Sequence, residues 1–145
     1  ANLRRIIRAL EVIEISGKPF TANLPRQESV RYPQARQFGL VMDRDDLSER
    51  IDVRVNAMFE QGLVAEVEKL ISAGLLQGRT AQRALGYSQV ISYLNNELSL
   101  DAAIEETKRA TRQYARRQET WFSRDSRIKW IATRQNRLET ILESL

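Results

Sequence analysis

Four cations recur at three- and four-residue steps in the segment Leu100–Phe122, LDAAIEETKRATRQYARRQETWF. They are Lys108, Arg109, Arg112 and Arg116. On a helix this spacing places the charges along one face, and a line of positive charge complements a polyanion. Arginine is also the side chain that contacts phosphate with two N–H groups at once and stacks on bases. Acidic residues four positions away are scarce in the second half of the segment, where only Glu119 interrupts. This scarcity favours a binding face over a self-neutralised, solvated face.

Arg54 is the second residue whose type and position suggest chemistry. It falls at the margin of the apolar face of a helix predicted over 47–61. The apolar positions of that face are Leu47, Ile51, Val55, Met58 and Phe59. An arginine this close to an apolar stripe needs an anion nearby. Asp43, Asp46 or Asp52 could supply it through a salt bridge, which position alone favours, and a bound anionic ligand could supply it instead.

The helices that must carry these cations are predicted from apolar spacing and from end signals. Ser99 is expected to cap the helix over 100–122, whose apolar stripe must pack on another element. Further helices are predicted over 1–16, 47–61, 63–73, a short stretch before Gly86, 88–95 and 133–145. The expected caps are Asp45 or Asp46 and Thr133, and the expected stops are Gly17, Gly62 and Gly74. Gly86 is expected either to need a positive φ or to end a helix.

Only two short strands are predicted, over 38–43, which we expect to be buried in a sheet, and over 128–131. All three prolines lie in residues 18–37, which are predicted to be a loop or linker. Two short strands cannot form an independent sheet. The fold class is therefore mostly α with two short strands, and we expect the chain to complete an α/β core whose other strands lie in sequence outside it.

Composition limits the chemistry that this chain can perform. Among its 145 residues there is no cysteine and no histidine, which excludes disulfides, thiol chemistry, Cys/His zinc sites and histidine acid–base catalysis within it. No apolar run approaches the roughly 18 residues needed to span a bilayer, and no signal peptide is visible, so we expect no membrane contact and a cytoplasmic location. Residues 79–137 carry twelve basic and six acidic side chains, whereas residues 43–69 carry four and eight. The uneven charge indicates an anionic partner.

Several stretches together resemble a known family. They are RRIIRALEV, SGKPF, GLVMDRDDLSERIDVRVNAMFEQGLVAEV, AQRALGYSQVISYL, and ATRQYARRQETWF followed by IKWI. In order and spacing, from Arg4 to about Ile131, they resemble the C-terminal portion of the tRNA dimethylallyltransferase, or tRNA isopentenyltransferase, family. The sequence departs from the family pattern at Leu3, Leu85 and Ser88.

The resemblance implies a fold and an activity. The fold would be a P-loop α/β core that carries a helical insertion domain, with residues 1–37 as the end of the insertion and the return to the core. Residues 38–145 would be the C-terminal part of that core. The activity would be transfer of a dimethylallyl group from dimethylallyl diphosphate to N6 of the adenosine adjacent to the anticodon, with Mg²⁺ as cofactor. The implied partners are the tRNA anticodon stem-loop and dimethylallyl diphosphate, and the protein is expected to be a monomer.

The resemblance also implies roles for residues of this chain. Arg54 matches the family's arginine on the diphosphate, where it would stabilise the transition state. The residues that match tRNA-contacting segments are Arg5, Arg79, Arg83, Arg109, Thr111, Arg112, Gln113 and Arg116. No metal ligand is implied in this chain, because the phosphate-binding GxxxxGK[ST] loop, the magnesium ligand and the proposed aspartate base would precede residue 1. The SGK of residues 16–18 lacks the glycine spacing of that loop. We therefore expect this chain to be inactive alone.

Two other function classes fit part of the sequence. A non-catalytic helical RNA-binding module accounts for the basic face but not for the position of Arg54. An interaction domain that binds an acidic protein accounts for the charge but not for the series of motifs.

Overall fold

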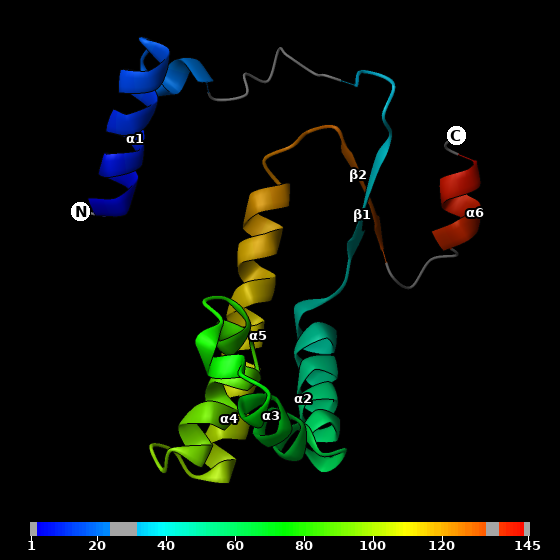
Figure 1. Ribbon diagram of the computed structural model, residues 1–145. Coiled ribbons are helices and arrows are strands. Elements are labelled where there is room, and N and C mark those ends of the chain that lie inside the picture. The colour runs from blue at the N-terminus through cyan, green and yellow to red at the C-terminus, as the bar shows by residue number, and fades with distance from the viewer. Residues whose placement is uncertain (1–2, 24–31, 133–136, 144–145) are drawn as a thin grey trace. The chain divides into compact units, whose positions relative to one another are not determined.

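The computed structural model describes residues 3–23, 32–132 and 137–143 (Figure 1). It divides into two units, residues 1–35 and residues 36–145, which are described separately. The first unit contains helix α1, Leu3–Ser16, and the short 3₁₀ helix η1, Phe20–Asn23. Gly17 ends α1 as predicted, with a φ of +64° and its N–H donating to the Ile13 carbonyl at 2.8 Å. No residue of α1 is buried, so its apolar face has no partner within the described part of this unit.

The second unit contains the strands and the remaining helices. Strand β1, Gln37–Val41, leads into α2, Arg44–Glu60, and α3, Leu63–Ser72. The short helices η2, Leu75–Gln77, and η3, Ala81–Arg83, precede α4, Tyr87–Leu94, and α5, Leu100–Phe122. Strand β2, Ile128–Ala132, and helix α6, Arg137–Leu142, follow. The prediction of a mostly helical chain with two short strands is confirmed, and the helical stretch expected before Gly86 is the 3₁₀ turn η3.

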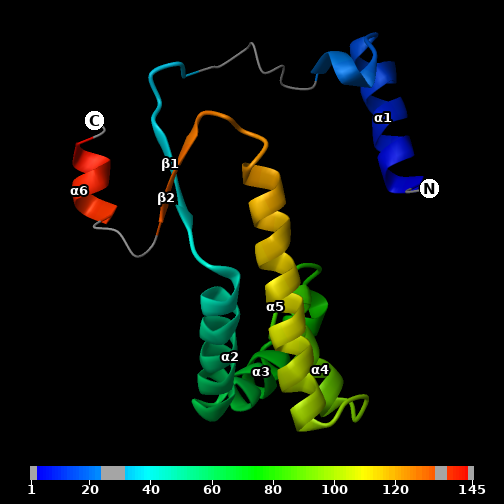
Figure 2. The same cartoon turned by 180° about the vertical axis from the view of Figure 1, so that it is seen from behind.

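Helices α2 to α5 pack together around apolar side chains. Leu63 and Val67 of α3 and Val90 of α4 form the buried cluster, and Met58, Phe59 and Ile91 pack against it. Figures 1 and 2 show α2 and α5 side by side, with α3 and α4 beside the N-terminal half of α5. Each buried side chain comes from the apolar stripe of its helix, so the three- and four-residue spacing accounts for this core.

The two strands pair in parallel, with Gly39 opposite Trp130. A Cβ atom at position 39 would lie 2.5 Å from Cε3 of Trp130, so only glycine allows the indole to lie against this backbone. The prediction that the first strand is buried is wrong for the described residues. Leu40 and Val41 are 53% and 42% exposed, because β1 has β2 as its one neighbour in the described part of the chain.

The helix ends follow glycine and capping chemistry, with one correction. Asp43 caps α2, not Asp45 or Asp46: its carboxylate accepts from the N–H groups of both, at 2.9 and 3.4 Å. In a run of acidic residues, the cap is the one that still has extended backbone, and Asp43 has ψ 144°. Gly62, Gly74 and Gly86 all have positive φ. The predicted cap Thr133 lies outside the described residues.

Candidate functional site

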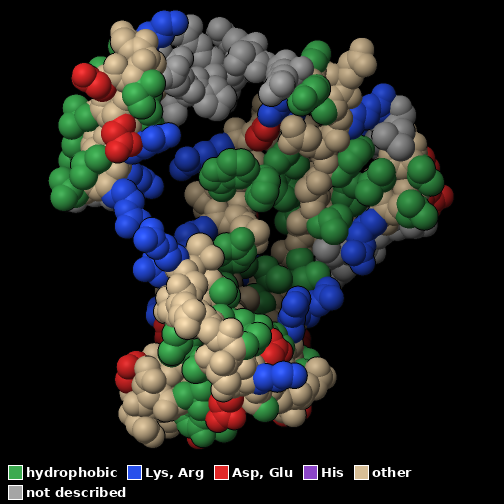
Figure 3. Space-filling model, in the orientation of Figure 1, with side chains coloured by type: hydrophobic (Ala, Val, Ile, Leu, Met, Phe, Trp, Pro, Cys, Tyr) green, Lys and Arg blue, Asp and Glu red, His purple; other side chains and the backbone are tan. Residues whose placement is uncertain are grey.

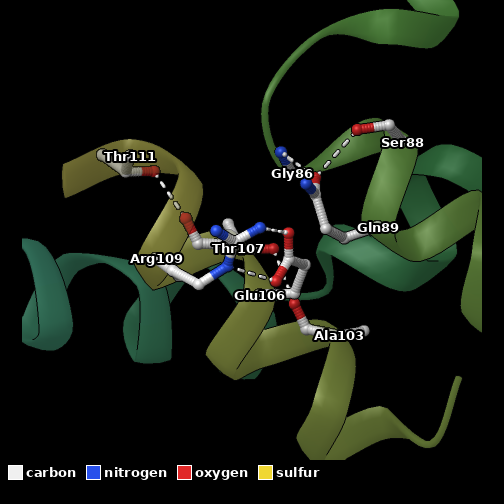
Figure 4. Close-up of polar contacts among 8 residues, drawn as sticks. All are labelled: Gly86, Ser88, Gln89, Ala103, Glu106, Thr107, Arg109 and Thr111. Atoms are coloured by element: carbon white, nitrogen blue, oxygen red, sulfur yellow. Dashed lines mark hydrogen bonds and ion pairs between the residues drawn. The ribbon is translucent and has the colours of Figure 1, made fainter. Parts of the chain in front are cut away.

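Helix α5 is the scaffold of the site, and its N-terminal half is fixed by burial. Ser99 caps it as predicted, its Oγ accepting from the Ala102 N–H at 3.2 Å. Ala103 and Thr107 are the buried residues of this helix. Thr107 Oγ1 donates to the Ala103 carbonyl at 2.7 Å, which satisfies a hydroxyl that would otherwise be buried without a partner (Figure 4). The sequence prediction missed Thr107, although it lies four residues after Ala103 on the apolar stripe.

The basic face of α5 is largely compensated by acidic side chains, contrary to the prediction. Lys108 pairs with Glu105 at 2.6 Å, and Arg109 donates to both carboxylate oxygens of Glu106 at 2.6 and 2.7 Å (Figure 4). These partners lie three residues before each cation, a spacing that also brings side chains together on a helix. The hydrogen bonds from Arg109 lower the pKa of Glu106 below its ordinary value, and the same bonds raise the pKa of Arg109.

Arg112 is held by another helix. Its guanidinium donates to the carboxylate of Asp52 on α2, and the two side chains are 32% and 41% exposed. This bridge ties α5 to α2 across a long interval of sequence. Arg116 makes no ion pair with any residue that the structure describes. Of the four cations, Arg116 is therefore the one whose charge is available without breaking a described contact.

Thr111 and Gln113 lie between these cations and differ in what they can offer. Thr111 is half-buried, and its Oγ1 donates to the Thr107 carbonyl at 2.7 Å (Figure 4). Gln113 is exposed. The Gln113 amide can therefore meet a ligand directly, whereas the Thr111 hydroxyl proton is already used within the helix.

The segment before the Gly86–Tyr87 pair carries Arg79 and Arg83, both exposed. Gln82 fixes this segment by donating to the Gly78 carbonyl at 2.5 Å. Gly86 is buried with a φ of +89°, and its N–H donates to Gln89 Oε1 at 2.9 Å (Figure 4). The turn thus sets where the chain that carries the two arginines enters α4, which packs on α5.

Tyr87 locks the other end of this turn. Its hydroxyl donates to the Glu66 carboxylate on α3, and that bond raises the pKa of Tyr87. The turn that precedes α4 is therefore tied to α3 as well as to the α4 side chain of Gln89.

Arg54 is exposed on α2 and pairs with none of the described acidic residues. The favoured salt bridge is therefore not found: Asp52 is bound to Arg112, and Asp43 caps α2. The expected partial desolvation of Arg54 is also wrong for the described residues. Its guanidinium is available to an anion from outside this chain. Arg5 is exposed on α1, in the first unit.

A pocket of about 820 Å³ lies among the strand pair, the start of α2 and the C-terminal half of α5. Its apolar walls include Phe38, Leu47, Ile51, Phe122 and Trp130. Arg112 and Arg116 line it, and Arg54 does not. Figure 3 shows hydrophobic side chains gathered in the hollow between α5 and the strands. The sequence did not predict this pocket, because its walls come from segments far apart in the chain.

Neither a metal cluster nor a membrane span occurs within residues 3–23, 32–132 and 137–143. These ranges contain no group of three or more acidic, histidine or cysteine side chains that could hold a metal ion. Over the same ranges, no helix has the length and apolar character needed to cross a bilayer.

Comparison with known proteins gives consistent matches. A family model described as IPP transferase matches residues 1–125. The tRNA dimethylallyltransferases of Nocardioides sp. (strain ATCC BAA-499 / JS614) and Thermobifida fusca (strain YX) are 55% and 57% identical to this chain over 130 residues. Those matches cover 90% of the chain but only 42% and 40% of the relatives, so the chain spans about two fifths of their length.

Two crystal structures have similar folds. The full-length tRNA isopentenylpyrophosphate transferase of Bacillus halodurans matches with a TM-score of 0.70 and 35% identity, over 99% of this chain and 43% of that one. The tRNA delta(2)-isopentenylpyrophosphate transferase of Staphylococcus epidermidis matches with a TM-score of 0.70 and 28% identity, over 99% and 47%.

Proposed function

We propose, because this chain belongs to the IPP transferase family, that it is part of an enzyme that prenylates tRNA. The whole protein would transfer a dimethylallyl group from dimethylallyl diphosphate to N6 of the adenosine adjacent to the anticodon. The observation that carries the proposal is the match to tRNA dimethylallyltransferases, above half identity over nine tenths of the chain. The basic face of α5 supports it, since it offers cations to a phosphate backbone.

In the proposed reaction, adenine N6 attacks C1 of the allylic diphosphate. The bond from C1 to the diphosphate oxygen breaks, the N6–C1 bond forms, and N6 loses a proton to a base that the resemblance places outside this chain. Negative charge grows on the departing diphosphate. Arg54, exposed and without a described ion pair, is suited to stabilise that charge.

Mg²⁺ does not fit the described residues of this chain, because they contain no cluster of acidic side chains that could ligate it. We therefore assign no metal ligand to this chain and no step to a metal held by it. The phosphate-binding loop and the metal site would belong to the remainder of the protein.

The same proposal assigns residues 1–37 to the end of a helical insertion domain and residues 38–145 to the C-terminal part of a P-loop α/β core. Parallel strands support this assignment, because parallel pairs occur in sheets with several strands and helical crossovers. The exposed side chains of β1 would then be covered by that larger sheet and its helices.

The residues proposed to contact tRNA fall into two groups. Arg5, Arg79, Arg83, Gln113 and Arg116 are exposed and can contact RNA as they stand. Arg109, Thr111 and Arg112 are engaged by Glu106, the Thr107 carbonyl and Asp52. Arg109 and Arg112 would have to share or exchange a carboxylate to bind phosphate, so each is proposed to reach RNA by giving up an ion pair that it already makes.

The test is transfer of a labelled dimethylallyl group to an unmodified anticodon stem-loop. The full-length protein should label N6 of the adenosine, and this chain alone should label nothing while the two are assayed at equal concentration. A full-length protein that binds the stem-loop without any transfer would refute the enzyme and leave the non-catalytic RNA-binding module. Transfer by this chain alone would refute the assignment of the base to the remainder of the protein.

A further inference from the structure

The last turns of α5 carry an exposed tryptophan among arginines. A shallow cavity of about 250 Å³ lies there, and its lining is Arg116, Arg117, Thr120, Trp121 and Arg124, which we call the Trp121 patch. Arg117 and Arg124 lie four residues before and three residues after Trp121, so the three share one side of the helix. Trp121 is 67% exposed. Figures 1 and 2 show why: the C-terminal turns of α5 extend beyond α2, α3 and α4.

The positive charge of the patch is not compensated by its acidic neighbours. Glu119 pairs with Arg44 of α2 at 3.7 Å, and Asp125 accepts two hydrogen bonds from the Arg127 guanidinium at 2.5 and 2.8 Å. Among the described residues, Arg116, Arg117 and Arg124 make no ion pair. Both nearby carboxylates are thus occupied by other arginines, which leaves the patch with three uncompensated charges.

The aromatic side chains of the patch are arranged for stacking. Trp121 makes an edge contact with Phe122, with ring centroids 4.8 Å apart and an interplanar angle of 88°. The Arg117 guanidinium lies 6.0 Å from the centre of the Tyr114 ring. Phe122 therefore restrains one edge of the indole, while two thirds of the Trp121 surface is open to solvent.

Simpler explanations account for only half of the patch. Arginines near a helix C-terminus interact favourably with the helix dipole, but that does not require an exposed tryptophan. Apolar packing by another protein segment would suit the indole, but it would bury arginines without partners. A nucleotide satisfies both features, because its base stacks on aromatic rings and its phosphates bind arginine.

We propose that the Trp121 patch binds an unpaired nucleotide of an RNA strand, with the base stacked on Trp121 and adjacent phosphates on Arg116, Arg117 and Arg124. The choice of RNA as the polyanion rests on the proposed function. The patch extends the RNA-binding face of α5 by nearly two turns and gives it a contact that depends on stacking as well as on charge.

The first experiment measures whether Trp121 meets RNA. In the full-length protein, every other tryptophan, Trp130 included, is replaced by phenylalanine, and Trp121 fluorescence is followed. An unmodified anticodon stem-loop should quench the emission and protect Trp121 from acrylamide, whereas polyglutamate should do neither. Equal protection by polyglutamate would point to an acidic protein partner, and a Trp121 shielded before any addition would show that the rest of the protein covers it. Either result overturns the proposal.

The second experiment measures the energetics. Trp121→Ala should weaken stem-loop binding by about five- to a hundredfold, the range for removal of one stacked base, and Trp121→Phe should restore much of it. Arg117→Gln and Arg124→Gln should each reduce the slope of log K against log salt by about 0.7. Lys69→Gln is the matched control, because Lys69 also lies in the last turn of a helix but outside the patch.

Unchanged affinity in folded Trp121→Ala, with its thermal unfolding preserved, would refute the patch. Dimethylallyl transfer by the otherwise unaltered protein is measured alongside. Failure of transfer tests the proposed function, whereas normal transfer together with unchanged RNA affinity in Trp121→Ala rejects only the nucleotide site.

Discussion

Replacing Asp52 by asparagine should both loosen the fold and strengthen RNA binding. The Asp52 carboxylate accepts from Arg112 across the α2–α5 interface, and the two side chains are 41% and 32% exposed. Ion pairs this accessible to water are worth about 0.2 to 1 kcal/mol in double-mutant cycles, and the partial burial here places the expected coupling in the upper half of that range. Asp52→Asn keeps the size of the side chain and removes its charge, so α2 and α5 should still pack.

The gain in binding follows from the same bridge. If Arg112 must leave Asp52 to reach phosphate, RNA binding is weakened by the energy of the bridge, and the asparagine variant no longer has that cost. A coupling of about 0.5 to 1 kcal/mol corresponds to a two- to fivefold tighter complex. The full-length variant should therefore bind the anticodon stem-loop about two- to fivefold more tightly while unfolding at lower urea concentration.

Arg112→Ala and the double variant complete the cycle. Arg112→Ala should weaken binding and reduce the salt slope by about 0.9, the value for one contact to duplex phosphate. In the Arg112→Ala background, Asp52→Asn should no longer strengthen binding. If neither single variant changes the salt slope, Arg112 only ties α2 to α5, and the reasoning that makes it an RNA ligand is refuted.

Replacing Arg109, Arg112 and Arg116 together by alanine should weaken tRNA binding and flatten its salt dependence by about 0.9 for each phosphate that the protein no longer touches, measured by titration at several salt concentrations; an unchanged slope would make this face merely solvated. Arg54→Ala should lower kcat/KM for dimethylallyl diphosphate by roughly two to three orders of magnitude without shifting thermal unfolding, because Arg54 makes no described ion pair; an early-melting variant with normal turnover would contradict this. Gly39→Ala should destabilise the fold by about 1 to 3 kcal/mol in urea unfolding, since its Cβ would displace the Trp130 ring, and Trp130→Ala should relieve part of that effect. The pKa of Asp125, which hydrogen bonds from Arg127 hold at about 2, should be measurable by NMR titration; the stability from this pair is present above the ordinary value of 3.8 and is lost as the pH falls toward about 2, and Arg127→Gln should return the pKa toward that ordinary value.

Local signals in the sequence were enough to predict most helix boundaries. Ser99 and the acidic first turn located the start of α5, and Gly17, Gly62 and Gly74 located helix ends, because each acts on backbone groups within a few residues. The Asp43 cap was missed for a local reason too. Three aspartates lie within four positions there, and only the backbone conformation decides between them.

Contacts between distant segments could not be predicted in the same way. The Arg112–Asp52 bridge joins residues 60 positions apart, and the pocket needs β1, α2, α5 and β2 together. The compensation of Lys108 and Arg109 was predictable in principle, since Glu105 and Glu106 precede them by three positions, but a prediction based on partners four residues away does not include it. The exposure of Trp121 was not predicted, because an aromatic residue on an apolar stripe is usually buried. It depends on α5 being longer than the helices beside it.

The parallel pairing of β1 and β2 also bears on the order in which this chain folds. Its closure joins segments separated by on the order of 90 residues, and the entropy of closing such a loop must be met before the strand contacts compensate for it. The contacts among α2, α3 and α4 are between neighbours in sequence and can form first. Docking of α5 on these helices then shortens the effective distance between the strands, so the register of Gly39 against Trp130 is set last. The pocket bordered by those strands is consequently a late product of folding, and variants that slow α5 docking should delay its appearance more than they delay helix formation.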